Sequence, residues 1–471
     1  MIPRFDGARK RNQAAPRRGT ELPGLALLAC FFLIFPSLAS GQDQPAPDQD
    51  RPPPEIRVIS PDEAVELAIK NNLGLESSRI GTETRKRAMD MSWNQFIPSI
   101  SLGGNLSRDN KASTTTVSVM PPITVENPQW HIAGSVQASL TLNAAMFEAM
   151  RTLRLSYEGG LIGYEKARIQ LERDVRKAYY QVLLLRENIA LLQESYAAAQ
   201  RQVTMAQANY RAGLVPELNV LQARVAMENL RPAIDQAENG LKMSMASFAN
   251  YLGLPYDTAF EFIPVETETA FIPLDTAELI SKAASGRPDI LELKHQILTL
   301  ESTRKAKLLS LTPSVTVGWN SNSVFIRDPF KDSLGNNDDW QQTGAFTLSL
   351  GIQLHSLIPF SPNFQAIKDI DDNLRSAHIG LAQAIRGTEL EIYNTVLTLE
   401  QARITVETQR LTAELAERTY RLTEEAYRAG LRELLEVQNT ELELRKARIG
   451  MLEQNFNYLK GLIDLEYAMG V

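Results

Sequence analysis

The stretch from Leu171 to Tyr210 constrains the fold of this chain more than any other. Positions taken at alternating steps of four and three form an apolar seam without charged or amide side chains: Leu171, Val175, Ala178, Val182, Leu185, Ile189, Leu192, Tyr196, Ala199, Val203, Ala206 and Tyr210. This heptad period predicts a coiled-coil helix. We expect it to run from about Ala144 to Ala212–Gly213, roughly 100 Å at about 1.5 Å per residue.

The same seam returns 217 positions later, with polar interruptions at Thr388, Thr395, Gln409 and Thr423. Its apolar members are Ile392, Leu399, Ala402, Val406, Ala413, Ala416, Tyr420 and Tyr427. A second apolar stripe runs beside it, formed by Leu397, Ile404, Leu411, Leu415 and Leu422. A helix with two apolar stripes has neighbours on two sides, which favours a wall of helices over an isolated pair.

Both predicted helices end in the tetrapeptide Tyr-Arg-Ala-Gly, at 210–213 and at 427–430. Glycine just past the last turn is the usual C-terminal cap of a helix. A second helical stretch follows each tip, at about 215–252 and about 432–468, and Pro232 should kink the first of these. The sequence therefore predicts two very long antiparallel helical hairpins.

The first 41 residues have the pattern of a secretory signal peptide, with a basic start and an apolar run from Leu22 to Leu38. Cys30, the only cysteine, lies inside this run, and Leu27–Cys30 also resembles a lipoprotein processing box. Acylation of Cys30 and its removal with the signal peptide remain alternatives. A proline-rich linker follows at 42–57. No later run reaches the roughly 18 apolar residues of a membrane helix.

Charge and residue usage argue against several functions. The chain carries a net charge of −7, and removal of the basic signal region leaves a mature chain of about −11. Such an acidic chain is a poor partner for nucleic acid. The four histidines (131, 295, 355 and 378) have no metal-ligand spacing, and no phosphate-binding loop or nucleophile motif occurs. We therefore predict no catalytic residue, metal site or cofactor, and no enzyme activity.

Four short stretches alternate polar and apolar residues with a period of two: 99–107, 136–142, 314–320 and 346–354. They could form a small sheet packed on the helices, or a membrane barrel wall that is apolar outside and polar inside. Four strands cannot close a membrane barrel, and open sheet edges do not occur in lipid. If these strands cross a membrane, several chains must pool them, eight strands from two copies or twelve from three.

The chain is predicted to be a tandem duplication of mixed α and β class. The first repeat covers 58–254 and the second 275–471, joined by a connection at 255–274. In each half, helices lead into two strands, which are followed by a long helix, a tip and another helix.

This organisation resembles the TolC-type outer-membrane efflux family over about residues 58–470. The most specific similarities are the strand entries at 96–99 and 311–314 and the tips at 210–223 and 427–439. The resemblance implies a homotrimer, whose twelve-stranded β-barrel lies in outer-membrane lipid and continues into a helical α-barrel across the periplasm. It also implies passive conduction, a periplasmic adaptor (membrane fusion) protein, and an inner-membrane pump or type I secretion complex behind that adaptor.

The resemblance also assigns roles to residues near the tips. It implies an acidic constriction at Glu436 and Asn439, and a lock formed by Tyr427 and Arg432 with Asn219 in the place of an acidic partner. Glu217 is the alternative partner for Arg432. Adaptor contacts are implied for Arg211, Ala212, Gly213, Leu214, Arg428, Ala429, Gly430 and Leu431. From spacing alone, Tyr427 could simply pack on the seam, and Arg432 and Glu436 could form a solvated bridge at positions i and i+4.

One alternative of another class remains at this point. A periplasmic coiled-coil adaptor or structural protein without a pore would also contain long helical hairpins. Dependence of the isolated protein on detergent would distinguish the two interpretations, because only a membrane channel has strands that face lipid.

Overall fold

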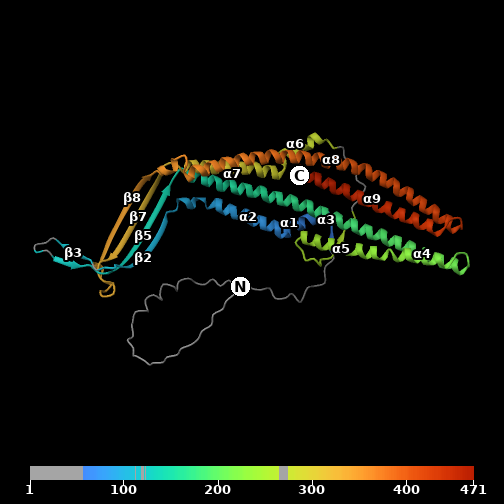
Figure 1. Cartoon of the computed structure of the whole chain (residues 1–471), viewed down its shortest axis with the longest axis horizontal. Helices are drawn as coiled ribbons and strands as arrows, with labels where there is room; N and C mark the ends of the chain where they lie inside the picture. The colour runs from blue at the N-terminus through green and yellow to red at the C-terminus, as the bar shows by residue number, and fades with distance from the viewer. Residues whose placement is uncertain (1–56, 112, 118–120, 122, 265–273, 471) are drawn as a thin grey trace, which may run out of the picture. The chain divides into compact units, whose positions relative to one another are not determined.

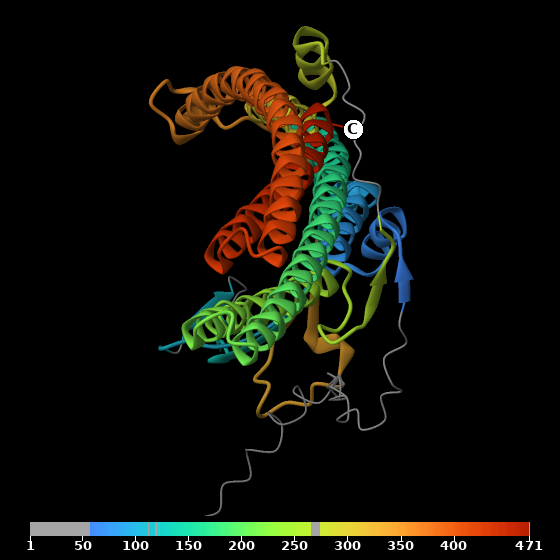
Figure 2. The same cartoon turned by 90° about the vertical axis from the view of Figure 1, so that its right-hand side faces the viewer.

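The computed structural model describes residues 57–111, 113–117, 121, 123–264 and 274–470. The predicted signal peptide with Cys30, most of the predicted linker and residues 265–273 of the predicted connection lie outside these residues. Two helices of 67 residues each dominate the fold, α3 (Ala145–Arg211) and α8 (Pro362–Arg428). The ends of α3 confirm its predicted length, the end of α8 confirms the predicted second tip, and both helices are visibly curved (Figure 2).

The remaining elements follow the predicted order of short helices, strands, long helix and return helix in each half (Figure 1). The other helices are α1 (Pro61–Asn71), α2 (Leu73–Asp90), η1 (Ser92–Phe96), α4 (Glu217–Glu228), α5 (Arg231–Tyr251), α6 (Thr276–Gly286), α7 (Pro288–Leu309), η2 (Asn337–Asp339), η3 (Leu354–Leu357) and α9 (Leu434–Met469). The strands are β1 (Arg57–Ile59), β2 (Ser99–Arg108), β3 (Thr114–Val117), β4 (Ile123–Glu126), β5 (Trp130–Leu142), β6 (Phe260–Phe262), β7 (Ser314–Phe325) and β8 (Trp340–Gly351).

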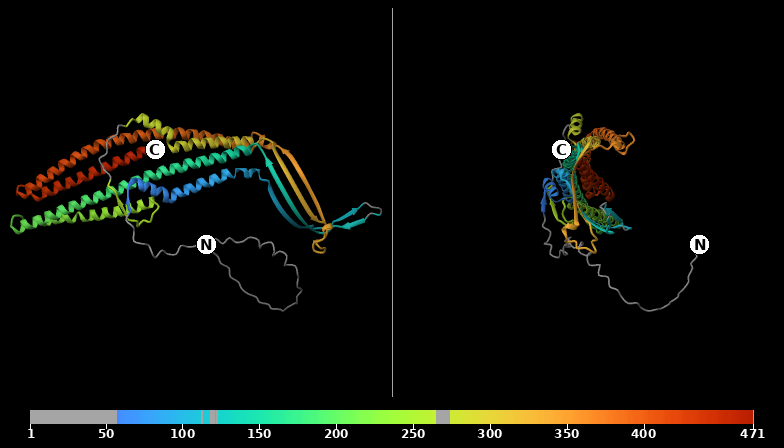
Figure 3. Two further views of the ribbon diagram at one scale, coloured as in Figure 1. Left: turned by 180° about the vertical axis from the view of Figure 1, so that it is seen from behind. Right: turned by 90° about the vertical axis from the view of Figure 1, so that its left-hand side faces the viewer.

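Four helices lie side by side next to the sheet, in the order α2, α3, α7 and α8 (Figure 3). The strands that adjoin them have the matching order β2-β5-β7-β8, and all neighbouring pairs are antiparallel. Each helix therefore leads into, or out of, the strand beside it, through the short helix η1 between α2 and β2 and through η3 between β8 and α8. Toward the tips, α4 and α5 pack along α3, and α9 packs along both α8 and α3.

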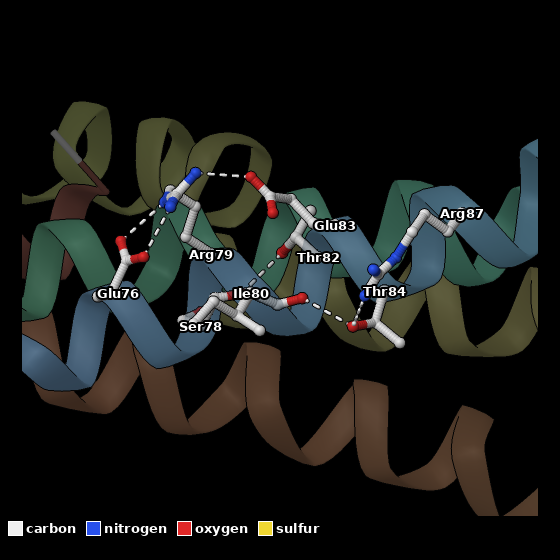
Figure 4. A network of polar contacts seen from close by, with 8 residues as sticks. All are labelled: Glu76, Ser78, Arg79, Ile80, Thr82, Glu83, Thr84 and Arg87. Carbon is white, nitrogen blue, oxygen red and sulfur yellow. Dashed lines mark hydrogen bonds and ion pairs between the residues drawn. The ribbon is translucent and has the colours of Figure 1, made fainter. Parts of the chain in front are cut away.

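Helix starts follow local capping rules. Ser60 and Glu63 form a reciprocal capping box at α1, with the Ser60 amide donating to Glu63 Oε2 at 2.8 Å. Asn72 ends α1 and caps α2, since its Oδ1 accepts from the Leu75 amide at 3.0 Å. On the surface of α2, the guanidinium of Arg79 binds the carboxylates of Glu76 and Glu83 (Figure 4). Such exposed pairs stabilise a helix only slightly and are weakened by salt.

The four predicted strands are present, with different ends. β5 begins at Trp130, six residues earlier than predicted, and β7 extends to Phe325. The prediction that the last strand continues to residue 354 is wrong, because β8 ends at Gly351. Gly351 pairs with Ser314, the first residue of β7. Ser314 is preceded by Pro313, which has no amide hydrogen to extend the ladder of hydrogen bonds.

Two small sheets were not predicted. β1 and β6 pair in parallel, so the predicted connection at 255–274 contains a strand. The hydroxyl of Tyr179, a fully buried residue of α3, lies 3.0 Å from the Ile59 carbonyl oxygen and 2.9 Å from that of Ile263. This places the two-stranded sheet against the main helical core. β3 and β4 pair in antiparallel fashion between β2 and β5 in the sequence.

The effect of Pro232 is larger than the predicted kink. The helix after the first tip ends at Glu228 and begins again at Arg231, so Pro232 lies in the first turn of α5. Proline has no amide hydrogen to donate to the carbonyl of Glu228, four residues earlier, and the first turn is where this loss is tolerated. Among the helices that the structure describes, none is both long and apolar enough to cross a membrane.

Candidate functional site: the two-faced sheet and the helical tips

One face of the four-stranded sheet is mainly apolar. Residues that pair directly across antiparallel strands share a face. From the helical end outward, the rows on this face are Leu142–Val315–Leu350, Leu140–Val317–Leu348, Ile100–Ala138–Trp319–Phe346, Leu102–Val136–Ser321–Gly344, Gly104–Gly134–Ser323–Gln342, Leu106–Ile132–Phe325–Trp340 and Arg108–Trp130. Leu102 is 83% exposed and Phe346 72% exposed. An apolar surface of this extent requires an apolar partner.

The opposite face of the same strands is polar but carries no fixed charge. Its rows are Ser314–Gly351, Thr141–Thr316–Ser349, Ser99–Ser139–Gly318–Thr347, Ser101–Gln137–Asn320–Ala345, Gly103–Ser135–Asn322–Thr343, Asn105–Ala133–Val324–Gln341 and Ser107–His131. Hydroxyl groups bind across strands here, as between Thr141 Oγ1 and Thr316 Oγ1 at 3.0 Å. This face suits contact with water.

Aromatic residues lie at both ends of the apolar face. At the helical end, the ring of Phe96 contacts those of Trp93 and Phe147, with centroid distances of 5.5 and 6.1 Å. At the far end, Trp130 makes an edge contact with Phe330 at 5.1 Å. Aromatic side chains at both rims of an apolar band are typical of strands that cross a membrane.

The outer strands of this sheet, β2 and β8, each pair on one side only within the described residues. An unpaired edge leaves a row of backbone donors and acceptors without partners, which lipid cannot satisfy. The sheet therefore needs strands from other chains if its apolar face meets lipid.

The two helical tips have the same cap. At the first, the amide of Leu214 donates to the Asn209 carbonyl and that of Gly213 to the Tyr210 carbonyl, both at 2.9 Å. At the second tip, the amides of Leu431 and Gly430 make the corresponding bonds, again at 2.9 Å. This pair of bonds is the Schellman motif, and it places Gly213 (φ 71°) and Gly430 (φ 75°) in the left-handed region.

Tyr427 lies in an apolar cluster that joins the helices at the tips. The cluster contains Val203, Ala206, Ala223, Tyr427, Leu434 and Val437, which come from α3, α4, α8 and α9. Tyr427 is 8% exposed, and its hydroxyl has no hydrogen-bond partner among the described residues. Tyr427 therefore packs on the apolar seam, as its spacing in the sequence allowed, but its hydroxyl makes no hydrogen bond within the described residues.

The other residues assigned to a gate are not brought together within one chain. Arg432, two residues before the start of α9, has its Nη1 2.9 Å from Oε2 of Glu436 in the first turn of that helix, and both side chains are partly exposed. Asn439 is exposed on the same helix, and Asn219 is half-buried in the first turn of α4. Among the described residues, no hydrogen bond or ion pair joins Arg432 to Asn219 or Glu217. The predicted bridge at positions i and i+4 is the contact that forms.

Sequence reasoning missed a polar cluster just beyond the tips. Glu441 of α9 accepts a hydrogen bond from Gln202 Nε2 of α3 at 3.2 Å, while its Oε1 is buried without a partner. Burial raises the pKa of Glu441, against the lowering effect of the nearby Arg445 and Arg201. Burial likewise raises the pKa of Tyr420 on α8. A carboxylate thus lies at a junction of three helices.

A sequence signal for Glu441 did exist. Leu434, Val437 and Leu444 are buried on α9, and steps of three, four and three along this helix run through Glu441. A charged residue on an otherwise apolar seam marks a buried charge.

Within the described residues, no group of three or more acidic, histidine or cysteine side chains is placed to hold a metal ion.

The class of this protein is defined by two features together. A sheet with one apolar face, one polar face and open edges is joined to long helical hairpins. The family model for outer membrane efflux proteins matches residues 64–254 and 279–471, and the chain belongs to this family. The protein is therefore an outer-membrane protein with its long helices in the periplasm.

Individual proteins show the same relationship. The chain is 26% identical over 263 residues to protein CyaE of Bordetella pertussis, covering 53% of this chain and 54% of CyaE. It is 23% identical to outer membrane efflux protein BepC of Brucella suis, covering 54% and 52% of the two chains. The chain thus spans about half the length of these relatives. The crystal structure of the Campylobacter jejuni CmeC outer membrane channel superposes with a TM-score of 0.70 at 15% identity, covering 87% of this chain and 85% of CmeC.

Proposed function

We propose that three copies of this chain form a channel that conducts substrates passively from a periplasmic transport complex to the outside. The two-faced sheet carries this proposal. Its apolar face would meet outer-membrane lipid, its uncharged polar face would line a water-filled pore, and its open edges would pair with those of neighbouring copies. A protein that works wholly within the periplasm would have no use for the exposed apolar face.

Strand number sets the smallest possible assembly. Single-chain membrane barrels have at least eight strands, so four strands from one chain are too few. Three copies supply twelve, the number expected from the family resemblance. The second apolar stripe of α8 supports contacts between copies, because its residues are 45–61% exposed in the single chain: Leu397, Ile404, Leu411, Leu415 and Leu422. These side chains would be covered when the helices close into an α-barrel.

We propose a periplasmic adaptor and an inner-membrane pump as the partners of this channel. The name of BepC describes it as an efflux protein, and a further relative, TtgC of Pseudomonas putida, is named as the outer membrane protein of a probable efflux pump. The tips offer apolar contacts for an adaptor, since Leu214 is 73% and Leu431 78% exposed. The surrounding segments at 211–214 and 428–431 would form the rest of that contact.

We propose the second tip as the gate. Glu436 would narrow the entrance, and its bridge to Arg432 would hold the start of α9 in place. The hydroxyl of Tyr427 would bind a polar group in the closed assembled channel, because a buried hydroxyl without a partner costs about 1–3 kcal/mol. Asn439 and Asn219 would contribute weaker, uncharged contacts to the same constriction.

The gate can be tested by antibiotic leakage through the outer membrane. We expect Glu436→Ala and Tyr427→Phe each to admit antibiotics that are too large for porins. Glu443→Ala is the matched control, since Glu443 is an exposed glutamate of the same helix that pairs with Lys446. Leakage that is equal in all three variants and the native protein would count against the gate.

The assembly can be tested by native mass of the mature protein extracted from membranes. We expect a particle of three chains that stays soluble only in detergent. A particle that is soluble without detergent would refute the lipid-facing sheet and favour a periplasmic scaffold.

Two neighbouring residues of β2 test the assignment of the faces. Leu102 lies in the middle of the apolar face and Ser101 on the polar face. Lysine at the lipid-facing midplane costs about 2–4 kcal/mol, so Leu102→Lys should lower the yield of membrane-inserted trimer. Ser101→Lys should leave the yield unchanged and shift the reversal potential toward anion selectivity, because it adds charge to an uncharged lining. Equal yields for the two variants would contradict the assigned faces.

A further inference from the structure

Arg108 is the one charged side chain on the apolar face of the four main strands. It is exposed, at the last position of β2, and pairs with Trp130 at the end of the sheet farthest from the helices. Its guanidinium carbon lies 5.5 Å from the centre of the Trp130 ring, a cation–π arrangement that orients the guanidinium. Among the described residues, no carboxylate forms an ion pair with Arg108.

The acidic residue next to Arg108 is engaged elsewhere. Asp109 Oδ2 lies 3.3 Å from Nε2 of His131, and His131 belongs to the polar face. On the apolar side, the ring of Trp130 is braced by the edge contact with Phe330. Arg108 therefore presents an uncompensated positive charge beside aromatic rings, above a band of exposed aliphatic side chains.

The depth of Arg108 can be worked out from the strand. Nine residue steps separate Ser99 from Arg108, about 31 Å at ~3.4 Å per residue. At the usual strand tilt of about 40°, this corresponds to roughly 23 Å of membrane height, close to the ~25 Å apolar band of such barrels. Because the helices at the other end lie in the periplasm, Arg108 lies at the outer boundary of that band, where lipid headgroups of the outer leaflet begin.

We propose that Arg108 and Trp130 bind a phosphate group of an outer-leaflet glycolipid whose acyl chains lie on the apolar rows below. The ligand chemistry follows from the surface, since a planar guanidinium is suited to phosphate oxygens and the rows of Leu106, Leu102 and Ile100 are suited to acyl chains. A trimer would carry three equivalent sites. This inference rests on the proposed lipid-facing sheet.

Native mass spectrometry of the detergent-solubilised protein, with bisphosphorylated lipid A as the probe, tests the site. We expect up to three bound lipids per trimer and a loss of about tenfold or more in affinity for Arg108→Gln, which removes charge-assisted hydrogen bonds. Trp130→Leu should weaken binding by about threefold, because it keeps an apolar side chain but removes the cation–π contact. Enzymatically dephosphorylated lipid A should bind the native protein as weakly as lipid A binds Arg108→Gln.

Arg87→Gln is the matched control, since Arg87 is an exposed arginine of α2 at the periplasmic end of the sheet. Equal loss of binding in Arg87→Gln and Arg108→Gln, or unchanged affinity in Arg108→Gln, would overturn the proposed site. Phosphatidylglycerol that binds as tightly as lipid A would assign the site to any anionic lipid and overturn the glycolipid. If the Leu102→Lys and Ser101→Lys variants still differ as expected, such results would remove this inference alone and leave the channel intact.

Discussion

Truncation of Leu434 to alanine should loosen the tips selectively. Leu434 is the first residue of α9, is 1% exposed, and lies in the cluster where α3, α4, α8 and α9 meet. The change removes three methylene-sized groups, worth about 0.8 kcal/mol each in transfer from water, and leaves a cavity that adds to this loss. We therefore expect a cost of about 3 kcal/mol, within the ~2–5 kcal/mol seen for buried leucines.

Hydrogen–deuterium exchange of the assembled protein measures this cost locally. Since about 1.4 kcal/mol corresponds to a tenfold change in an equilibrium, amides at 426–441 should exchange roughly 100-fold faster through local opening. Amides of β7 should be unaffected, because this strand lies at the opposite end of the long helices. Passive antibiotic leakage should rise in parallel if local opening of this tip widens the entrance.

Leu435→Ala provides the comparison, because Leu435 is the adjacent residue, is of the same type, and is 54% exposed. Its truncation should cost only about 1 kcal/mol, since half of its surface already meets solvent. Equal acceleration of exchange by Leu434→Ala and Leu435→Ala would refute the tip cluster as the element that holds the hairpin ends together.

Two further predictions concern glycine turns and the buried carboxylate. Gly253→Ala should prevent stable folding, because an added Cβ would lie 2.2 Å from the Asn71 carbonyl oxygen. Gly213→Ala should cost only about 1 kcal/mol, because Gly213 has a positive φ but open space around it. Similar thermal midpoints for the two variants would contradict this prediction. The pKa of Glu441 is raised in the folded protein. At pH values between the ordinary and the raised pKa, the folded state therefore holds a proton that the unfolded chain has released. The contribution of Glu441 to the free energy of unfolding should therefore fall as pH rises from the ordinary carboxyl pKa to the raised pKa. Glu441→Gln should remove this dependence, so its thermal midpoint should gain on that of the native protein as pH rises above the ordinary carboxyl pKa of 4.5, and a constant difference would refute the raised pKa.

The sequence predicted the long helices because the signals that define them are local. The seam of α3 repeats every seven residues, and each tip carries a glycine whose positive φ ends the helix through two backbone bonds. The four strands were found for the same reason, since a period of two marks a face. Their ends were less well predicted: Gly134 and Ala133 weaken the alternation at the start of β5, where pairing with β2 and β7 maintains the strand.

Long-range contacts left no comparable signal. β1 and β6 have three residues each and pair across about two hundred positions, so no local period marks them. The tip residues divide in the same way. The bridge between Arg432 and Glu436 follows from their spacing of four residues at the start of α9, whereas the buried hydroxyl of Tyr427 depends on how α8 meets α3, α4 and α9. A gate built between copies would leave no trace in the periodicity of one chain.

The two halves differ most in the helix after each tip, and this difference bears on how the tips could move. After the first tip the chain forms two shorter helices, α4 and α5, separated at residues 229 and 230. After the second tip, α9 continues unbroken for 36 residues and packs on both long helices. A shift of the second tip must therefore move α9 as one body and shear the cluster around Leu434, while the first tip can bend at the break before Pro232. The Gln202–Glu441 contact joins α3 to α9 within the moving region, so any such shift has to break or carry it.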